Sequence, residues 1–400
     1  MNKRLLVLPL LLACTTGDAG EVHVYDAYAG PEAYPNRRPP IVLPSGDVGF
    51  VSNSRSDDIS VIDLQKNVVI AQPPVGRNPV DVDSPHHLAV DRTKGALYTV
   101  LSYPAVAASG PHAAHGSSQK LGYLQKLSLT DLALQGEVRV DENPGDIVLS
   151  DDGRRIVVSH FDLVRARLFD SEPRANLVIA DPDQLLPSGS PDPVRVRVCR
   201  APHGIALSRP DGKLAYVACY ADDAIAVVDT SNPAATPTLV PLGQALTKGD
   251  TPLFGPYSIV LSPTGKWLAV GNTESKDVLL FDTATLKPKG PAIATGGAAF
   301  FPAWSTDEKR LYVPTQNPDG IRVIDVETST VTAFRAFTPE ECQKPHELGF
   351  LSDARALYTV CEGDQVSPSV VRTLDPTSLD PLARIAVGAY PDRMVVVKIP

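Results

Sequence analysis

Three histidines occupy one position of a repeated pattern, each directly after a proline and ahead of a short apolar run. They are His86, His203 and His346, and Tyr257 holds the same position in another copy. Histidine titrates near neutral pH and is the commonest metal ligand in proteins, so these residues predict a ligand face. A metal or haem-iron set is one interpretation, and hydrogen bonding of each imidazole to loop backbone is the other.

Three further histidines belong to long insertions in the same pattern. His112 and His115 lie in the insertion 102–122, and His160 precedes the insertion 161–174. The His112-x-x-His115 pair sits in Ala/Gly/Ser-rich sequence and lacks the glutamate of a zinc-protease helix. Long loops on a rigid scaffold commonly carry binding, so we add these residues to the candidate ligand face. We predict no cofactor, with a metal as the alternative.

The repeat that positions these residues consists of about four short strands. Residues 202–217 read as a strand, a Pro-Asp-Gly turn and a second strand, and a third strand follows at 224–229. The end of the third strand recurs seven times, at Asp63, Ser128, Asp181, Asp229, Asp282, Asp325 and Asp375. Four strands per unit of this length predict an all-β, seven-bladed β-propeller with four-stranded antiparallel blades.

Two outlying segments bear on the number of blades. Val22–Asp26 and Met394–Ile399 both read as strands outside the seven units. We expect one of them to complete a blade begun at the opposite end of the chain. If each belonged to a separate blade, the count would be eight.

The blades resemble the YVTN-type repeat family, also called YncE-like or lactonase-like propellers. The matching text is Ile205-Ala206-Leu207-Ser208, Asp211-Gly212-Lys213, Tyr216-Val217 and Val228-Asp229, with a second match at 259–266. The resemblance covers roughly residues 41–400 and implies the fold. It does not select a function, because such folds host enzymes and binding proteins alike.

Four cysteines have matched positions in two of the repeats. Cys199 and Cys342 precede a Pro-His pair, and Cys219 and Cys361 end the second strand of the same blade. Both positions fall on one face of the disc, so an exported protein should form the disulfides Cys199–Cys219 and Cys342–Cys361. A metal or haem site is the alternative, although Cys-x-x-Pro-His is not the haem-attachment motif.

The N-terminus has the pattern of a bacterial lipoprotein signal. Lys3 and Arg4 precede a short apolar stretch that ends in Leu11-Leu12-Ala13-Cys14. We therefore expect residues 1–13 to be a signal peptide, Cys14 to be lipidated, residues 14–40 to be a tether with the N-terminal strand, and residues 41–400 to be the propeller. Thr15, which is not an aspartate, favours the outer membrane over the inner one. An ordinary secretory signal is the alternative.

The composition and the missing motifs argue against several classes of function. The net charge of −9 argues against a nucleic-acid binder. We find no phosphate loop, Gly-x-Ser-x-Gly elbow or dinucleotide fingerprint, and predict no catalytic residues. Acidic residues between the second and third strands suggest either calcium binding or, our preference, turn formation: Asp57, Asp58, Asp222, Asp223, Glu274, Asp277, Glu362 and Asp364.

These observations lead to two functional hypotheses. The first is a monomeric envelope lipoprotein, attached to the membrane through its lipid only, that binds a protein, glycan or small ligand through the face carrying the histidines. The second is a propeller enzyme, either a lactonase or a redox protein similar to amine dehydrogenases. The sequence lacks a recognisable quinone-cofactor signature, so the first hypothesis leads.

Overall fold

Strands from the two ends of the propeller share one sheet, which closes the molecule into a ring. The protein is described from a computed structural model that covers residues 40–77, 82–103, 120–168, 172–187, 189–244, 246 and 250–400. β1 (Gly46–Asn53) pairs antiparallel with β30 (Pro391–Ile399), with Val48 opposite Val397. The C-terminal strand therefore completes the first blade, as expected of one of the two outlying segments, and Val22–Asp26 lies outside the described residues.

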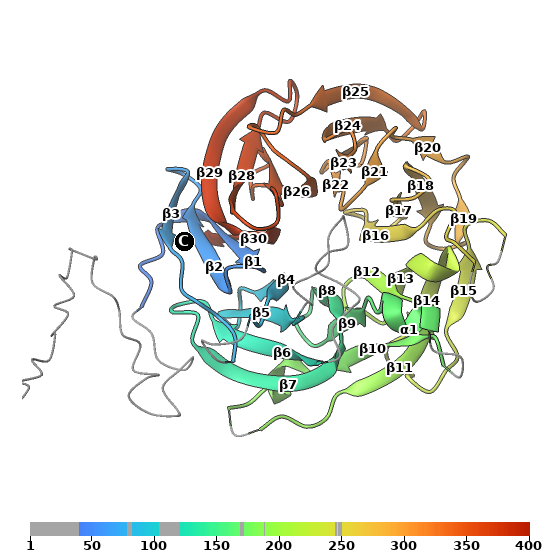
Figure 1. Ribbon diagram of the computed structural model, residues 1–400, viewed down its shortest axis with the longest axis horizontal. Coiled ribbons are helices and arrows are strands. Elements are labelled where there is room, and N and C mark those ends of the chain that lie inside the picture. Colours follow the sequence, from blue (N-terminus) through green and yellow to red (C-terminus); the bar gives the residue numbers. More distant parts are fainter. Residues whose placement is uncertain are drawn as a thin grey trace, which may run out of the picture.

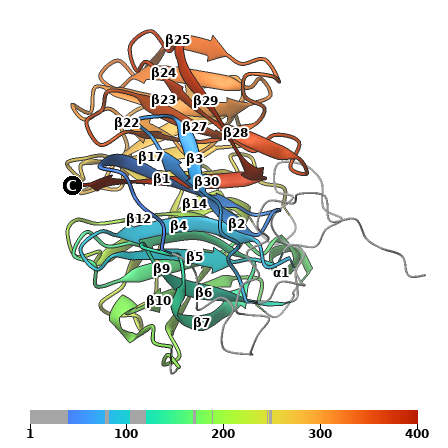
Figure 2. The same ribbon diagram turned by 90° about the vertical axis from the view of Figure 1, so that its left-hand side faces the viewer.

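Seven antiparallel sheets are arranged as blades around a central axis (Figure 1), and Figure 2 shows the disc from its side. The predicted seven-bladed propeller is confirmed. Blade 1 comprises, from the inner to the outer strand, β30, β1, β2 (Asp58–Asp63) and β3 (Val68–Ala71). Blade 2 comprises β4 (Pro85–Asp91), β5 (Ala96–Leu101), β6 (Leu121–Ser128) and β7 (Leu134–Glu142).

Blades 3 and 4 follow the same order. Blade 3 comprises β8 (Pro144–Leu149), β9 (Ile156–His160), β10 (Ala175–Ala180) and β11 (Val194–Cys199). Blade 4 comprises β12 (Pro202–Leu207), β13 (Leu214–Cys219), β14 (Ala224–Asp229) and β15 (Thr238–Pro241). The short helical segments of the described chain are α1 (Leu163–Leu168), η2 (Pro182–Gln184) and η3 (Tyr220–Asp222).

Blades 5 and 6 each contain one divided strand. Blade 5 comprises β16 (Pro256–Leu261), β17 (Trp267–Asn272), β18 (Asp277–Asp282) and an outer strand split into β19 (Lys287–Pro288) and β20 (Ile293–Ala294). Blade 6 has an inner strand split into β21 (Ala298–Ala299) and β22 (Ala303–Trp304), then β23 (Arg310–Gln316), β24 (Gly320–Asp325) and β25 (Thr330–Ala336). Blade 7 comprises β26 (Pro345–Phe350), β27 (Leu357–Cys361), β28 (Pro368–Leu374) and β29 (Pro381–Ala389).

The repeated aspartate caps the turn after the third strand. Asp63 Oδ1 accepts hydrogen bonds from the backbone N–H groups of Gln65 (3.0 Å) and Lys66 (3.1 Å). Asp375 makes equivalent bonds in blade 7. A carboxylate that binds the backbone two or three residues ahead forms an Asx turn, which explains why this residue marks the repeat. All seven predicted third strands are present, as β2, β6, β10, β14, β18, β24 and β28.

The hydrophobic core lies between the blades. Each pair of neighbouring blades encloses an apolar cluster; between blades 1 and 2 it includes Val48, Phe50, Leu88 and Leu97, all at most 1% exposed. A single blade buries neither of its faces, so closing the ring is what removes this surface from water. At about 25 cal/mol per Å² of apolar area, these interfaces are the main favourable contribution to folding.

We call the face where the inner strands begin the entry face, and the opposite one the exit face. Aspartates in the entry-face links bind the start of the next blade: Asp57 accepts from the Ser84 N–H (2.7 Å) and Asp223 from the Gly255 N–H (2.8 Å). Both aspartates have positive φ, of 54° and 47°, as expected of tight turns. The preferred interpretation as turn residues is thus incomplete, because these carboxylates also connect successive blades.

Candidate functional site

The inner strands begin with a proline followed by an irregular register. The pairing shifts between Pro85 and Leu88, between Pro144 and Ile147, and between Pro202 and Ile205, with similar shifts after Pro256 and Pro345. A β-bulge breaks the alternation of a strand and re-aims its side chains. Two consecutive residues can therefore turn toward the axis where an ordinary strand would present one.

Four histidines from three different blades meet at the axis, and we call them the histidine cluster: His86, His87, His203 and His346. The rings of His86 and His87 are stacked with centroids 4.3 Å apart. The His87 ring centroid lies 5.8 Å from those of His203 and His346. All four side chains are at most 2% exposed. The cluster thus fills the entry side of the channel with imidazoles.

In every imidazole of the histidine cluster, the Nδ1 atom lies within hydrogen-bonding distance of an oxygen atom. His203 Nδ1 lies 3.1 Å from the Tyr257 carbonyl oxygen, and His346 Nδ1 lies 3.0 Å from that of Asp392. A carbonyl only accepts, so both Nδ1 atoms carry the proton. His86 and His87 face the carboxylates of Asp392 (2.9 Å) and Asp146 (2.8 Å). In the neutral ring each Nε2 is then a lone-pair acceptor.

Burial keeps two of these rings neutral. It lowers the pKa of His346 to about 4 and holds the pKa of His87 well below its usual value. The neighbouring imidazoles and Arg393 act in the same direction on His87. At neutral pH these two side chains therefore offer hydrogen-bond acceptors and potential bases, not cations.

Two buried glutamates show the opposite shift. Burial raises the pKa of Glu347 to about 7 and that of Glu362 to about 8. Glu362 Oε1 lies 3.9 Å from His346 Nε2, and its carboxyl accepts hydrogen bonds from Gln365 (2.6 Å) and Gln316 (3.4 Å). A protonated acid beside a neutral base is the arrangement from which acid–base roles are assigned in known sites.

An arginine from the closing strand lies next to the histidine cluster. Arg393 Nη1 donates to Asp146 Oδ1 (2.7 Å), the same oxygen that binds His87. The other oxygen of Asp146 accepts from the backbone N–H of Ile205 (2.9 Å). One carboxylate therefore joins a histidine of blade 2, the start of blade 4 and the closing strand of blade 1.

Aromatic rings line the side of the cluster away from these charges. Tyr257 stacks on His203 with centroids 3.8 Å apart, and Phe161 meets the His203 ring edge to face at 5.1 Å. Phe301 approaches His87 at 5.2 Å. The site thus combines charged groups from blades 1, 2, 3 and 7 with aromatic rings from blades 3, 5 and 6.

The structure brings together His86, His203, His346 and Tyr257 of the predicted ligand face. His160 lies apart: its Nδ1 is 2.8 Å from the Asn176 carbonyl oxygen and its Nε2 accepts from the Asp141 N–H (3.1 Å). Both ring nitrogens are thus used in backbone contacts. His112, His115 and Cys14 lie outside the described residues.

The residues that follow the aligned position were not predicted from the sequence. These are His87, Asp146, Phe301, Glu347 and Arg393, all close to the axis. The available signal was the next column of the repeat alignment, where histidine and charged residues replace the apolar residues of an inner strand. Glu362, which was assigned to a turn, also faces the channel through His346.

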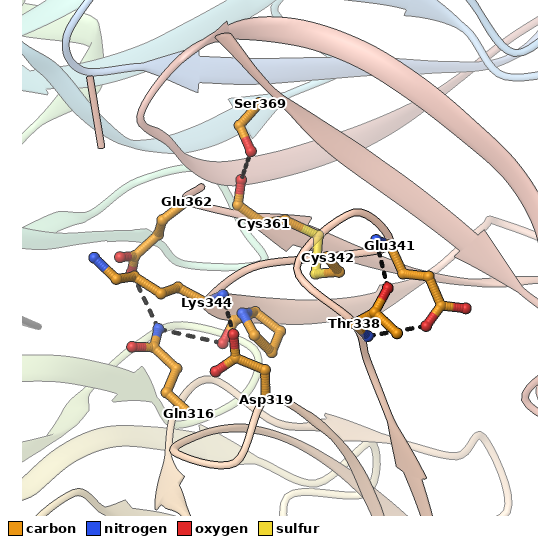
Figure 3. The surroundings of a disulfide bond; sticks show 10 residues. Gln316, Asp319, Thr338, Glu341, Cys342, Lys344, Cys361, Glu362 and Ser369 are labelled. Atoms are coloured by element: carbon orange, nitrogen blue, oxygen red, sulfur yellow. Dashed lines mark hydrogen bonds between the residues drawn. A yellow bond between two sulfur atoms is a disulfide. The ribbon is translucent and has the colours of Figure 1, made fainter. Parts of the chain in front are cut away.

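Both predicted disulfides are present. Cys199–Cys219 and Cys342–Cys361 have Cα separations of 5.9 and 5.4 Å, and each joins the entry of an inner strand to the end of the neighbouring second strand. Figure 3 shows that Glu362 directly follows Cys361 and that Gln316 reaches its carboxyl group. The disulfide therefore fixes the two segments that carry His346 and Glu362. Two such bonds are typical of an oxidising compartment, which suggests an exported protein.

The described part of the chain holds no group of three or more His, Cys, Asp or Glu side chains placed to bind a metal ion. Within the same residues, no helix has the length and apolar character needed to cross a membrane.

No protein-family model and no curated protein matches the sequence. Solved structures share its fold. A putative 6-phosphogluconolactonase from Bacteroides uniformis and a periplasmic gluconolactonase from Pseudomonas aeruginosa are each 15% identical, each with a TM-score of 0.60 over 88% of this chain and 100% of theirs. A dihydro-heme d1 dehydrogenase is 17% identical, with a TM-score of 0.55 over 90% of this chain and 79% of its own. At these identities the similarity shows the β-propeller fold and nothing finer.

Proposed function

We propose that this protein is an exported binding protein that holds a small, hydrogen-bonding ligand at the histidine cluster. The observation that carries the proposal is the His87 Nε2 atom. It is buried, and among the described residues it has no hydrogen-bond partner, while Asp146 fixes it as an acceptor. An unpaired buried polar atom costs about 1–3 kcal/mol, which a donating ligand would offset.

The geometry favours a ligand with neighbouring donors. His346 offers a second Nε2 acceptor, and the two ring centroids are 5.8 Å apart. Adjacent hydroxyl groups of a polyol or sugar suit two acceptors at this spacing. Tyr257 and Phe161 supply the aromatic surface on which the carbon face of such a molecule packs.

The test uses 1,5-anhydro-D-glucitol, a neutral polyol that cannot be hydrolysed. We expect it to shift the ¹⁵N resonance of His87 Nε2 in a saturable titration of the full chain. His160 is an internal control, because its Nε2 already accepts from the Asp141 N–H. A His87 resonance that stays fixed, or that moves together with His160, would show that the cluster is only a polar core.

We further propose that Cys14 anchors the exported protein by lipid, with the outer membrane as its destination. The predicted signal and the two disulfides support this proposal. Replacing Cys14 with serine should move the protein from the membrane fraction to the soluble fraction. Unchanged fractionation of the Cys14→Ser variant would contradict a lipid anchor.

Lactone hydrolysis is a second candidate, and the Glu362–His346 pair favours it. In this reaction His346 Nε2 would take a proton from water as the water oxygen bonds to the lactone carbonyl carbon. Glu362 would donate its proton to the ring oxygen as the acyl–oxygen bond breaks, leaving an open hydroxy acid. The proton on His346 would then return to Glu362 across the 3.9 Å gap.

The two functions are separated by one measurement. If the protein is a lactonase, a pH-stat should record opening of D-glucono-1,5-lactone well above its spontaneous rate. A rate equal to the spontaneous one, together with binding of 1,5-anhydro-D-glucitol, would support binding without turnover.

A further inference from the structure

A second feature of the channel lies on its exit side. Two adjoining cavities of 240 and 370 Å³ open there. They share five lining residues, Arg209, Val260, Leu261, Phe301 and Arg393, so we treat them as one space and call it the exit cavity. Each of the two volumes lies close to the lower limit of the range for ligand pockets, about 300–1,000 Å³.

The walls of the exit cavity combine polar and apolar groups in about equal measure. Inner strands supply aliphatic side chains such as Leu207 and Leu261, and Trp304 and Phe350 add two large aromatic groups. Trp304 is fixed by a hydrogen bond from its indole N–H to the Val260 carbonyl (3.2 Å). The apolar part of this lining favours a ligand with an aromatic or aliphatic body.

Arg393 provides the charge at the inner end of the exit cavity. It contacts both lobes, and its side chain is 23% exposed. A guanidinium has five N–H donors, and one of them binds Asp146. Within the described residues the Nε–H has no hydrogen-bond partner, although Glu347 Oε1 lies 3.1 Å away in an unsuitable direction. The Nε–H of Arg393 is therefore a donor that no described residue satisfies, while the guanidinium is ion-paired with Asp146 and Glu347.

The carboxylates beside Arg393 are engaged elsewhere. Asp146 also accepts from His87 and from the backbone of Ile147 and Ile205. Glu347 Oε2 accepts from the Met394 N–H (2.8 Å), and burial raises the pKa of Glu347 to about 7, so much of it is uncharged near neutral pH. Asp146 thus remains the principal counter-charge of Arg393, and Glu347 contributes only part of a second one.

We propose that the exit cavity binds a small organic carboxylate, with the carboxylate on Arg393 and an apolar body against Trp304, Phe301 and Leu261. Arginine recognises a carboxylate through paired N–H donors, and such charge-assisted bonds are strong where water is excluded. This site shares Arg393, Asp146 and Phe301 with the surroundings of the histidine cluster, but it opens on the opposite face and takes an anion instead of a polyol. The proposal does not depend on the function assigned to that cluster.

The test is a calorimetric titration of the full chain with benzoate and with its neutral isostere benzamide. We expect saturable benzoate binding with a Kd of about 1 mM or lower, and at least about tenfold weaker benzamide binding. Arg393→Gln keeps a donor for Asp146 but removes the charge. This variant should weaken benzoate binding by about tenfold or more and leave benzamide binding unchanged.

A second pair of variants covers the case in which Arg393→Gln does not fold. Leu261→Trp fills the exit cavity without removing a charge, and it should abolish benzoate binding. Leu239→Trp is the matched control, because Leu239 is 46% exposed on the outer strand of blade 4. Equal affinity for benzoate and benzamide, or benzoate binding that survives Leu261→Trp, would overturn the proposal. Absence of saturable benzoate binding to the wild type would also overturn it.

Discussion

Blades 4 and 7 carry the same disulfide and the same Pro-His pair, yet they offer different chemistry. In blade 4, Gly204 follows His203 and Tyr220 follows Cys219; in blade 7, Glu347 follows His346 and Glu362 follows Cys361. A Cβ on Gly204 would lie 2.8 Å from the backbone of Ser258 and Ile259, so blade 5 closes that position. The corresponding position of blade 7 instead holds a carboxyl group that reaches Arg393.

The two blades share the residues that set the backbone geometry and differ in the residues that can react or bind. The cysteines and the Pro-His pair are common to both blades because both need the same entry geometry. The residues directly after His346 and Cys361 differ from their blade 4 counterparts and carry the strongest upward pKa shifts among the described glutamates. Substitutions in blade 4 can therefore serve as matched controls for the corresponding substitutions in blade 7.

The largest contrast is expected in catalysis, if lactone opening is observed. Glu362→Gln removes the proposed acid while keeping the shape, so it should reduce the rate by at least about 100-fold. Tyr220→Phe, at the corresponding site of blade 4, should change the rate by less than about twofold, and initial rates in the pH-stat would measure both. Similar losses in the two variants would remove the distinction between the blades.

A second contrast concerns the disulfides. Replacing both cysteines of either bond with serine should lower the free energy of unfolding by about 3 kcal/mol, because loops of about 20 residues are released. Urea titration would measure this loss. Cys342→Ser/Cys361→Ser should also weaken ligand binding at the histidine cluster more than the blade 4 pair does, since its bond positions the acceptor His346 together with Glu362, whereas the blade 4 bond positions His203 alone. Equal weakening in the blade 4 pair would refute the asymmetry.

The pH dependence of stability should differ between the blades. The raised pKa of Glu362 gives stability that is fully present below pH 4.5 and is lost as pH rises through about 8. The lowered pKa of His346 gives stability that is present above pH 6.5 and is lost as pH falls through about 4. Relative to the wild type, Glu362→Gln should therefore reduce the loss of unfolding free energy as the pH rises toward 8. His346→Gln should reduce the loss of unfolding free energy as the pH falls toward 4.

Tyr220→Phe is the control for this titration. Burial and Glu274 raise the pKa of Tyr220 above its usual value, so the phenol does not titrate between pH 4 and 8. Unfolding free energies from urea titration at several pH values would give the slopes. A Glu362→Gln variant with the slope of the wild type would show that Glu362 is ionised in the folded state.

The smallest expected effect is on the stability of blade 4. Tyr220 Oη donates to Glu274 Oε1 (2.6 Å), linking blade 4 to blade 5. Removing this hydroxyl should lower the free energy of unfolding by about 1–2 kcal/mol, independently of any ligand. Thermal unfolding with and without 1,5-anhydro-D-glucitol would show whether the loss is constant. A ligand-dependent loss would place Tyr220 in the binding site.

The fold could be predicted from the sequence because its signals are local and repeated. In six of the seven blades an aspartate at the end of the third strand caps a turn within three residues, as Asp63 and Asp375 do, and it marks the repeat by itself. The disulfides followed from the placement of strand ends. Half of the site could also be predicted from the sequence, because His86, His203 and His346 share one position of the repeat alignment.

The other half of the site could not be predicted by the same reasoning. Alternation along a strand places consecutive side chains on opposite sides, so only one residue after each proline was expected at the axis. The bulge after the proline brings the next residue in as well, and its type differs from blade to blade: His87, Asp146, Glu347 and Arg393 do not form a repeat. His160 was misleading because its partners, Asn176 and Asp141, come from other segments.

The closing strand β30 has a consequence for the order of assembly. It supplies Asp392, which binds His86, and Arg393, which binds Asp146. β30 follows the other strands of the described residues, so it is also the last of them to be synthesised. Until it docks against β1, His86 lacks its carboxylate partner and Asp146 lacks its arginine. Ring closure is therefore the step that completes the ionic contacts around the histidine cluster.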